Sequence, residues 1–175
     1  MGVRTQDWST ALSEAVGGGV TPDAAARTII DDLAAEYRNH LPVIEGAVPS
    51  VKRLAKEFTL GLVSGSPASL IHLILQLLDL PACFQVAMSA DDVARGKPAP
   101  DPYLHLASRL DLPPVACVAV EDSANGIRSA RSAGMAVIAI PRGEHRPSES
   151  VLKLASAVLD DISQLTPRAV HQIAA

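Results

Sequence analysis

The sequence lacks the features of several common protein classes. It has no surplus of positive charge: fifteen Lys and Arg residues stand against nineteen Asp and Glu, a net charge of −4. Without a basic stripe, nucleic acid is not expected as a partner. The only two cysteines, Cys83 and Cys117, lie in apolar surroundings. We therefore expect small core residues rather than a disulfide framework, as in a cytoplasmic protein.

Long apolar runs are also missing. No stretch reaches membrane-spanning length, so no membrane is expected as a partner. The polar residues Arg4 to Asp7 do not resemble a signal peptide, and none is expected. The 175 residues are 48% hydrophobic and 19% charged, which favours a packed core over disorder. One domain, or a domain with an appended lobe, is predicted, and the oligomeric state is not indicated.

Apolar segments alternate with helical patterns along most of the chain. Strands are expected at residues 59–63, 84–88, 115–120, 135–140 and 157–159, with helices between them. This alternation predicts an α/β fold with a parallel, doubly wound sheet.

The first forty residues have a different pattern. A helix over residues 5–16, three glycines, and a second helix that begins at Thr21-Pro22-Asp23 predict a helical hairpin. Trp8 and Tyr37 could line a substrate cleft. Aromatic residues at helical spacing are more often core residues, which is the favoured interpretation.

Two acids, Glu121 and Asp122, follow the predicted strand 115–120, whose run of Val, Ala and Cys indicates burial on both faces. Open α/β sheets bind ligands at such strand ends. Adjacent carboxylates suit Mg²⁺, which takes one or two carboxylates, waters and a substrate phosphate. Lys97, in a loop upstream, suits a phosphoryl group. Alternatively the acids only favour the N-terminus of the next helix, which explains one acid but not Lys97.

Ser64, Gly65 and Ser66 follow the predicted strand 59–63. A hydroxyl group and glycine-permitted backbone N–H groups can hold phosphate oxygens there. The alternative is a plain turn before a helix, because Ser66-Pro67 is a good helix start. The turn would be preferred for this segment alone; together with Lys97 and the two acids, phosphate contact is favoured.

Other charged residues are expected to be solvated or to cap helices. Asp91 and Asp92 precede the lysine loop and are interpreted in this way rather than as metal ligands. Arg142, His145 and Arg146 lie in a predicted loop. They could bind anions, but a solvated surface loop is the favoured interpretation.

These motifs resemble those of the haloacid dehalogenase-superfamily hydrolases, β-phosphoglucomutase-like subgroup. Residues 62–66 resemble the family's second motif, residues 96–101 its lysine motif, and residues 121–126 its acidic motif. The resemblance covers residues 41–159, with the motifs in the family's order. It implies residues 1–44 as a partial helical cap and residues 45–175 as the α/β core.

The family's first motif, Asp-x-Asp-x-Thr, has no counterpart in this sequence. It supplies a nucleophilic aspartate and a general acid/base on the strand that is central in the family's sheet. The resemblance therefore implies an N-terminally truncated chain lacking about fifty to sixty residues of a usual domain. The competing explanation is a pseudoenzyme with a rearranged sheet.

The function implied by the resemblance is that of a Mg²⁺-dependent phosphatase acting on a small phosphorylated metabolite, a sugar or polyol phosphate, through an aspartyl phosphate. Ser64 and Lys97 would be catalytic. Ser64, Gly65, Ser66 and Lys97 would bind phosphate, and Glu121 and Asp122 would bind metal. The alternatives are a sugar-phosphate mutase and a non-catalytic protein that binds phosphate and Mg²⁺. A receiver-like doubly wound domain is a weaker fold alternative, because no aspartate is suitably placed.

Overall fold

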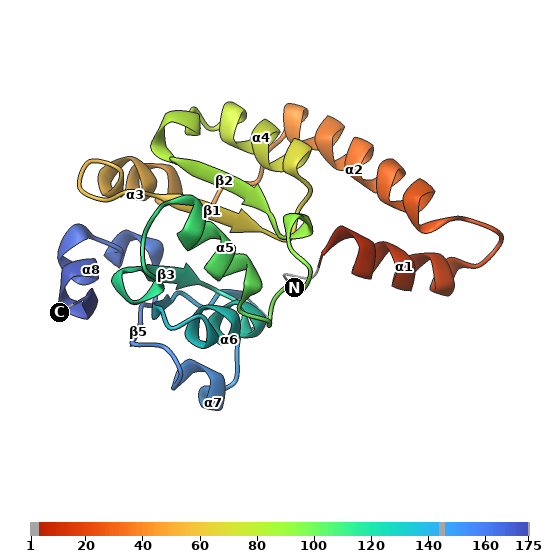
Figure 1. Cartoon of the computed structure of the whole chain (residues 1–175). Helices are drawn as coiled ribbons and strands as arrows, with labels where there is room; N and C mark the ends of the chain where they lie inside the picture. Colours follow the sequence, from red (N-terminus) through yellow and green to blue (C-terminus); the bar gives the residue numbers. More distant parts are fainter. Residues whose placement is uncertain (1–3, 144–145, 175) are drawn as a thin grey trace.

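The structure, a computed structural model, describes residues 4–143 and 146–174 (Figure 1). Its helices are α1 (Thr5–Val16), α2 (Pro22–Asn39), α3 (Ala47–Leu54), α4 (Ala68–Leu77), α5 (Asp101–Arg109), α6 (Ala124–Ser132), α7 (Glu149–Leu152) and α8 (Pro167–Ala174). Its strands are β1 (Gly61–Ser64), β2 (Val86–Ser89), β3 (Val118–Glu121), β4 (Ala136–Ala139) and β5 (Ala157–Val158). The predicted α/β alternation is confirmed.

The strands form two parallel sheets. β1 pairs with β2 in one sheet, and β3, β4 and β5 follow in that order in the other. Within the described residues, β1 and β3 therefore each have one edge without a strand partner. Ser64 is the last residue of β1, and Glu121 is the last residue of β3. Both therefore lie at the carboxyl ends of parallel strands, where doubly wound folds bind their ligands.

Apolar residues of the strands and helices make the core. The main cluster joins β1 to β4 with α5, α6 and α7, and includes the fully buried Ile127, Ala130 and Val137. A second cluster, around Ile138, packs α3 and α8 on the other side of β4, and a third joins α4 to β2. Helices thus cover both faces of the strands, as the sequence predicts.

The strand start that differs most from the sequence prediction is that of β3. Residues 115–120 were expected as a strand, but Pro114–Ala116 form a 3₁₀ turn and β3 starts at Val118. Val115 is 81% exposed, so it is not part of the buried run. Pro113 and Pro114 lack the backbone N–H that a central strand must donate, and they hold the chain in a turn here.

The predicted N-terminal hairpin is confirmed. α1 packs against α2, and α2 against α4, so the pair extends from one side of the strands (Figure 1). The Thr21 hydroxyl accepts a hydrogen bond from the Ala24 N–H, as expected of a cap. The start of α1 is tied to the segment before the lysine loop, because the Thr5 N–H donates to Asp91 and Arg4 donates to the Ala94 carbonyl.

Candidate active site

Lys97 connects the ends of the two sheets. Its ammonium nitrogen lies 2.5 Å from Glu121 Oε1, at the end of β3, and 3.5 Å from the Val63 carbonyl oxygen, in β1. Lys97 and Glu121 are both buried. The structure therefore brings together the lysine and the first acid that the sequence singled out, although they lie far apart along the chain.

Tyr103, on α5, completes this buried cluster. Its hydroxyl group donates to the same Glu121 oxygen, at 2.5 Å, and lies 3.4 Å from the Lys97 nitrogen. The Lys97 nitrogen also lies 4.9 Å from the centre of the Tyr103 ring. Burial, together with the negative charge of Glu121, raises the pKa of Tyr103 well above its usual value. Tyr103 thus remains a hydrogen-bond donor to Glu121.

The N-terminus of α6 holds the other Glu121 oxygen. The Ser123 hydroxyl donates to Glu121 Oε2 at 3.1 Å and accepts from the Gly126 N–H at 3.0 Å. A methyl group at Gly126 would overlap the Glu121 carboxylate, because its carbon would lie 1.8 Å from Oε2. Residue 126 is therefore a glycine for reasons of space, and Glu121 lies directly against the first turn of α6.

Asp122 has a different environment from its neighbour. It is exposed and lines a cavity, whereas Glu121 is 8% exposed and already accepts three hydrogen bonds. Asp122 is therefore the acid that a solvated cation can reach directly. Glu121 has little remaining capacity to accept hydrogen bonds or to bind a cation.

The cavity lies between the strand ends and the helical hairpin and has a volume of about 710 Å³. Every residue predicted to bind phosphate or metal lines it: Ser64, Gly65, Ser66, Lys97, Glu121 and Asp122. Ser64 Oγ accepts from the Ser66 N–H at 3.1 Å, so its own hydroxyl hydrogen is available to another acceptor. The structure places these residues together; their roles stay predictions.

Residues that the sequence did not assign to the site also line this cavity, among them Trp8 and Arg142. Trp8, on α1, is half-buried and lines the cavity, which is the alternative that the sequence left open for it. Arg142, expected in a solvated loop, is exposed but lies on the cavity wall. Arg146 is exposed, as expected, and His145 lies outside the described residues.

Asp91 and Asp92 are capping groups, as predicted. Asp91 accepts from the Thr5 N–H, and Asp92 accepts from the Ser89 N–H in a capping box. Cys83 and Cys117 are free and partly buried, and burial raises the pKa of the Cys117 thiol. The part of the chain that the structure describes has no cluster of three or more His, Cys, Asp or Glu residues suited to a metal ion.

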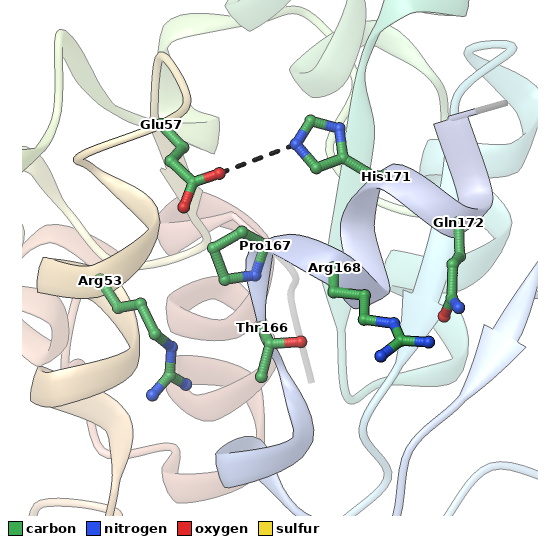
Figure 2. A pocket seen from close by; sticks show the side chains of 7 residues that line it. All are labelled: Arg53, Glu57, Thr166, Pro167, Arg168, His171 and Gln172. Atoms are coloured by element: carbon green, nitrogen blue, oxygen red, sulfur yellow. Dashed lines mark ion pairs between the residues drawn. The ribbon is translucent and has the colours of Figure 1, made fainter.

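A second cavity, of about 780 Å³, lies beside α8 and contains none of the predicted site residues (Figure 2). Its side chains serve mainly to hold α8 in place. Arg53 donates to the Leu165 carbonyl, and His171 lies 3.7 Å from Glu57 and against the Phe58 ring. We therefore assign the candidate site to the first cavity.

Sequence reasoning missed Tyr103 and Gly126. Tyr103 follows Lys97 by six positions, and nothing in the sequence indicates that its hydroxyl group reaches Glu121 at the end of the strand after its own helix. Gly126 offered a signal, because glycine is unfavourable within a helix and needs a reason there.

Together the fold and this cavity define the class of protein: a doubly wound α/β protein whose site lies at the carboxyl ends of parallel strands. The chain belongs to the haloacid dehalogenase-like hydrolases, since the model of that family matches residues 2–134. The predicted family, and with it enzymatic activity as the property of the family, is confirmed.

Curated relatives include two kinds of phosphatase. Hexitol phosphatase B of Escherichia coli O157:H7 is 33% identical over 136 residues, which is 78% of this chain and 60% of that protein. Phosphoglycolate phosphatase of Salmonella paratyphi A is 33% identical over 113 residues, 65% of this chain and 45% of that protein. The chain thus spans about 60% or less of the length of these relatives.

Solved structures agree on the fold. β-Phosphoglucomutase from Clostridium difficile superimposes with a TM-score of 0.81 at 19% identity, over 99% of this chain and 78% of that chain. CbbY from Rhodobacter sphaeroides, solved with phosphate, gives a TM-score of 0.71 at 26% identity, over 85% of this chain and 67% of that one. Within residues 4–143 and 146–174, no helix has the length and apolar content needed to span a membrane.

Proposed function

We propose that this protein is a Mg²⁺-dependent phosphatase-type hydrolase acting on a small phosphorylated metabolite, a sugar or polyol phosphate. One observation carries the proposal: Ser64, Lys97 and Asp122, from three separate parts of the chain, line a single cavity at the strand ends. The phosphatase relatives support the reaction class.

In this proposal the phosphoryl group lies at the end of β1. The Ser64 hydroxyl and the N–H groups of Gly65 and Ser66 donate to its oxygens, and Lys97 offsets the negative charge of the transition state. Lys97 already forms an ion pair with Glu121. Tyr103 and Ser123 hold Glu121 in place, so they also orient Lys97.

The donor set fits Mg²⁺, which needs one or two carboxylates and fills its other positions with water and phosphate oxygens. Asp122, exposed in the cavity, would be the direct ligand. Glu121, whose oxygens already accept from three donors, would contribute through water. When bound, the ion would neutralise phosphate charge during transfer.

The nucleophile belongs to a segment outside these 175 residues, in this proposal. The sequence has no Asp-x-Asp, and β1 and β3 each leave one edge unpaired within the described residues, on either side of the cavity. A strand placed between them would bring an aspartate beside Lys97. An oxygen of this aspartate would bond to phosphorus while the bond to the ester oxygen breaks, and a second acid would protonate that leaving oxygen. Water would then attack the aspartyl phosphate, which releases inorganic phosphate and restores the aspartate.

The proposal also covers the domain boundary. Residues 1–44 form a partial cap and residues 45–175 the core, with the cap helices bounding the cavity from the side opposite the strand ends. Trp8, Ile29 and Ile30 are the cap side chains nearest this role, because they line the cavity.

The test uses Trp8 as a reporter, because the single tryptophan lines the cavity. Its fluorescence is titrated with inorganic phosphate and with Mg²⁺ on the 175-residue chain. Ser64→Ala should weaken phosphate binding about tenfold, and Asp122→Asn should weaken Mg²⁺ binding at least as much. Asp160→Asn is the matched control, because Asp160 is an exposed acid that does not line the cavity. Equal affinities in all four proteins would refute the assignment.

Turnover separates the remaining alternatives. The 175-residue chain should release no phosphate from sugar phosphates, whereas a longer form carrying an upstream Asp-x-Asp should release it in step with substrate loss. An isomerised product without free phosphate would indicate a mutase. Phosphate release by the 175-residue chain itself would place the nucleophile among the residues described here and overturn that part of the proposal.

A further inference from the structure

Not every charged residue that lines the cavity forms an ion pair with another residue of the cavity; four charged residues line it. They are Lys97, Arg142, Glu121 and Asp122. Lys97 and Glu121 form an ion pair at 2.5 Å, and Asp122 is assigned above to a cation. Arg142 remains, exposed on the cavity wall in the segment that follows β4. Its positive charge helps to lower the pKa of Asp161, but none of the described acids lies close enough to Arg142 to form an ion pair with it.

The helical hairpin contributes a wall of another kind. The side chains that α1 and α2 present to the cavity are Trp8, Ile29, Ile30 and Leu33. Apart from the Trp8 indole N–H, this wall has no side-chain group that can hydrogen-bond. Many substrate hydroxyl groups placed against this wall would lose their hydrogen bonds to water without gaining new ones. Within the sugar and polyol phosphates proposed above, the wall therefore favours short chains that present few hydroxyl groups to it.

The two walls therefore favour one kind of leaving group. Hydrocarbon can lie against the apolar wall, and a negative charge can lie near Arg142, whose planar guanidinium suits carboxylate and phosphate oxygens. The volume of about 710 Å³ is within the usual range for small-molecule sites.

We propose that Arg142 binds a second anionic group of the substrate, so that the site prefers small phosphate esters that also carry a carboxylate or a second phosphate. This inference rests on the phosphate site proposed above and narrows its substrate class. Arg142 is a specificity residue in this scheme, and the phosphoryl group itself stays with Ser64 and Lys97.

The experiment compares three ligands with the same two-carbon skeleton: 2-hydroxyethyl phosphate, 2-phosphoglycolate and ethylene glycol bisphosphate. They differ only in the second group, which is neutral, a carboxylate or a phosphate. Binding to the 175-residue chain is measured by calorimetry and by Trp8 fluorescence with Mg²⁺ present. The variants are Arg142→Gln and, as a control of equal charge change in the same loop, Arg146→Gln, which is exposed and does not line the cavity.

We expect the wild-type chain and Arg146→Gln to bind 2-phosphoglycolate, ethylene glycol bisphosphate or both about tenfold more tightly than 2-hydroxyethyl phosphate, which has no second anionic group. Arg142→Gln should lose that preference while keeping its affinity for 2-hydroxyethyl phosphate. The ligand that loses most affinity identifies the second group as carboxylate or phosphate.

Two results would overturn the inference. Equal wild-type affinity for all three ligands would mean that no second anionic group is recognised. If Arg142→Gln lowered the affinity for all three ligands equally, or had the same affinities as Arg146→Gln, Arg142 would not be the residue that binds the second anionic group. Failure of the phosphate site is distinguishable, because 2-hydroxyethyl phosphate and inorganic phosphate would then not bind at all, and the narrower inference would fall with it.

Discussion

Lys97 and Glu121 show how a single pair of residues can organise a site. Both are buried, and such a pair is favourable only when its remaining hydrogen-bonding capacity is satisfied. Tyr103 and Ser123 supply the further donors to Glu121. The cluster therefore fixes the Lys97 ammonium at the mouth of the gap between β1 and β3, where the proposed chemistry needs a positive charge.

The ionisation of Tyr103 tests this cluster. Because its pKa in the folded protein is raised above the usual 10.0, the folded state holds the phenol proton more tightly than the unfolded chain does. Its contribution to the free energy of unfolding is therefore complete below about pH 10 and is lost as the pH rises beyond that. The sequence has two tyrosines, so in a Tyr37→Phe variant the tyrosinate absorbance reports Tyr103 alone. Without metal, this absorbance should appear only above pH 10 and together with unfolding.

Tyr103→Phe is the companion variant, and it should make the free energy of unfolding less dependent on pH above 10. A Tyr103 that ionised near pH 10 in a protein whose circular dichroism was still native would contradict the buried hydrogen bond to Glu121.

Gly126 gives a second prediction at this scale. Gly→Ala within a helix normally stabilises it, by about 1 kcal/mol. Here the added methyl group would overlap the Glu121 carboxylate, so Gly126→Ala should destabilise the protein instead. Denaturant unfolding should show this, and the same substitution in a Glu121→Ala background should be neutral or stabilising. Destabilisation of equal size in both backgrounds would mean that Glu121 is not the obstacle.

At the scale of elements, α6 is the helix on which the site depends. Its N-cap residue, Ser123, accepts from the Gly126 N–H, and the same hydroxyl donates to Glu121. The cap therefore fixes both the start of the helix and the acid at the end of β3. α7 begins at a comparable residue, Ser148, whose side chain makes no capping hydrogen bond.

This contrast predicts different effects of the same substitution. Ser123→Ala should lower the free energy of unfolding by about 1 kcal/mol or more, since the cap and the bond to Glu121 are both lost. Ser148→Ala should change it by only a few tenths of that amount. Urea unfolding of both variants measures the difference, and equal effects would argue against a special role for the α6 cap.

Element boundaries depended on how local the signal was. α1 was predicted at its observed limits, Thr5–Val16, because its polar start and the three glycines after it act within the segment. The start of β3 was predicted too early because the apolar run 115–120 has the composition of a strand. In the structure, Pro113-Pro114 hold the beginning of this run in a turn, which leaves Val115 exposed to solvent.

At the scale of the whole molecule, the two sheets are the main feature. β4 has partners on both sides, whereas β1 and β3 each have a partner on one side only within the described residues. Val120, in β3, is 42% exposed and lines the cavity. A strand with one unpaired edge leaves alternate backbone groups to water.

Hydrogen exchange should report this arrangement directly. In the 175-residue chain, amides of β4 should exchange most slowly, and alternate amides of β1 and β3 should exchange at least tenfold faster. Heteronuclear NMR after transfer to D₂O resolves the individual amides. Uniform, strong protection along β1 and β3 would mean that both edges are covered in solution, contrary to the arrangement described here.

The sequence by itself determined the family, the α/β alternation and the residues that meet at the cavity: Ser64, Lys97, Glu121 and Asp122. It could do so because strand ends are marked within short segments, and parallel connections bring the carboxyl ends of strands to one side. Only the tertiary structure decided that Glu121 is buried while Asp122 is exposed, and that Tyr103, Gly126, Trp8 and Arg142 lie at the site. Except for Gly126, whose place within a helix is a local signal, those placements depend on contacts between residues distant in sequence, which local patterns do not encode.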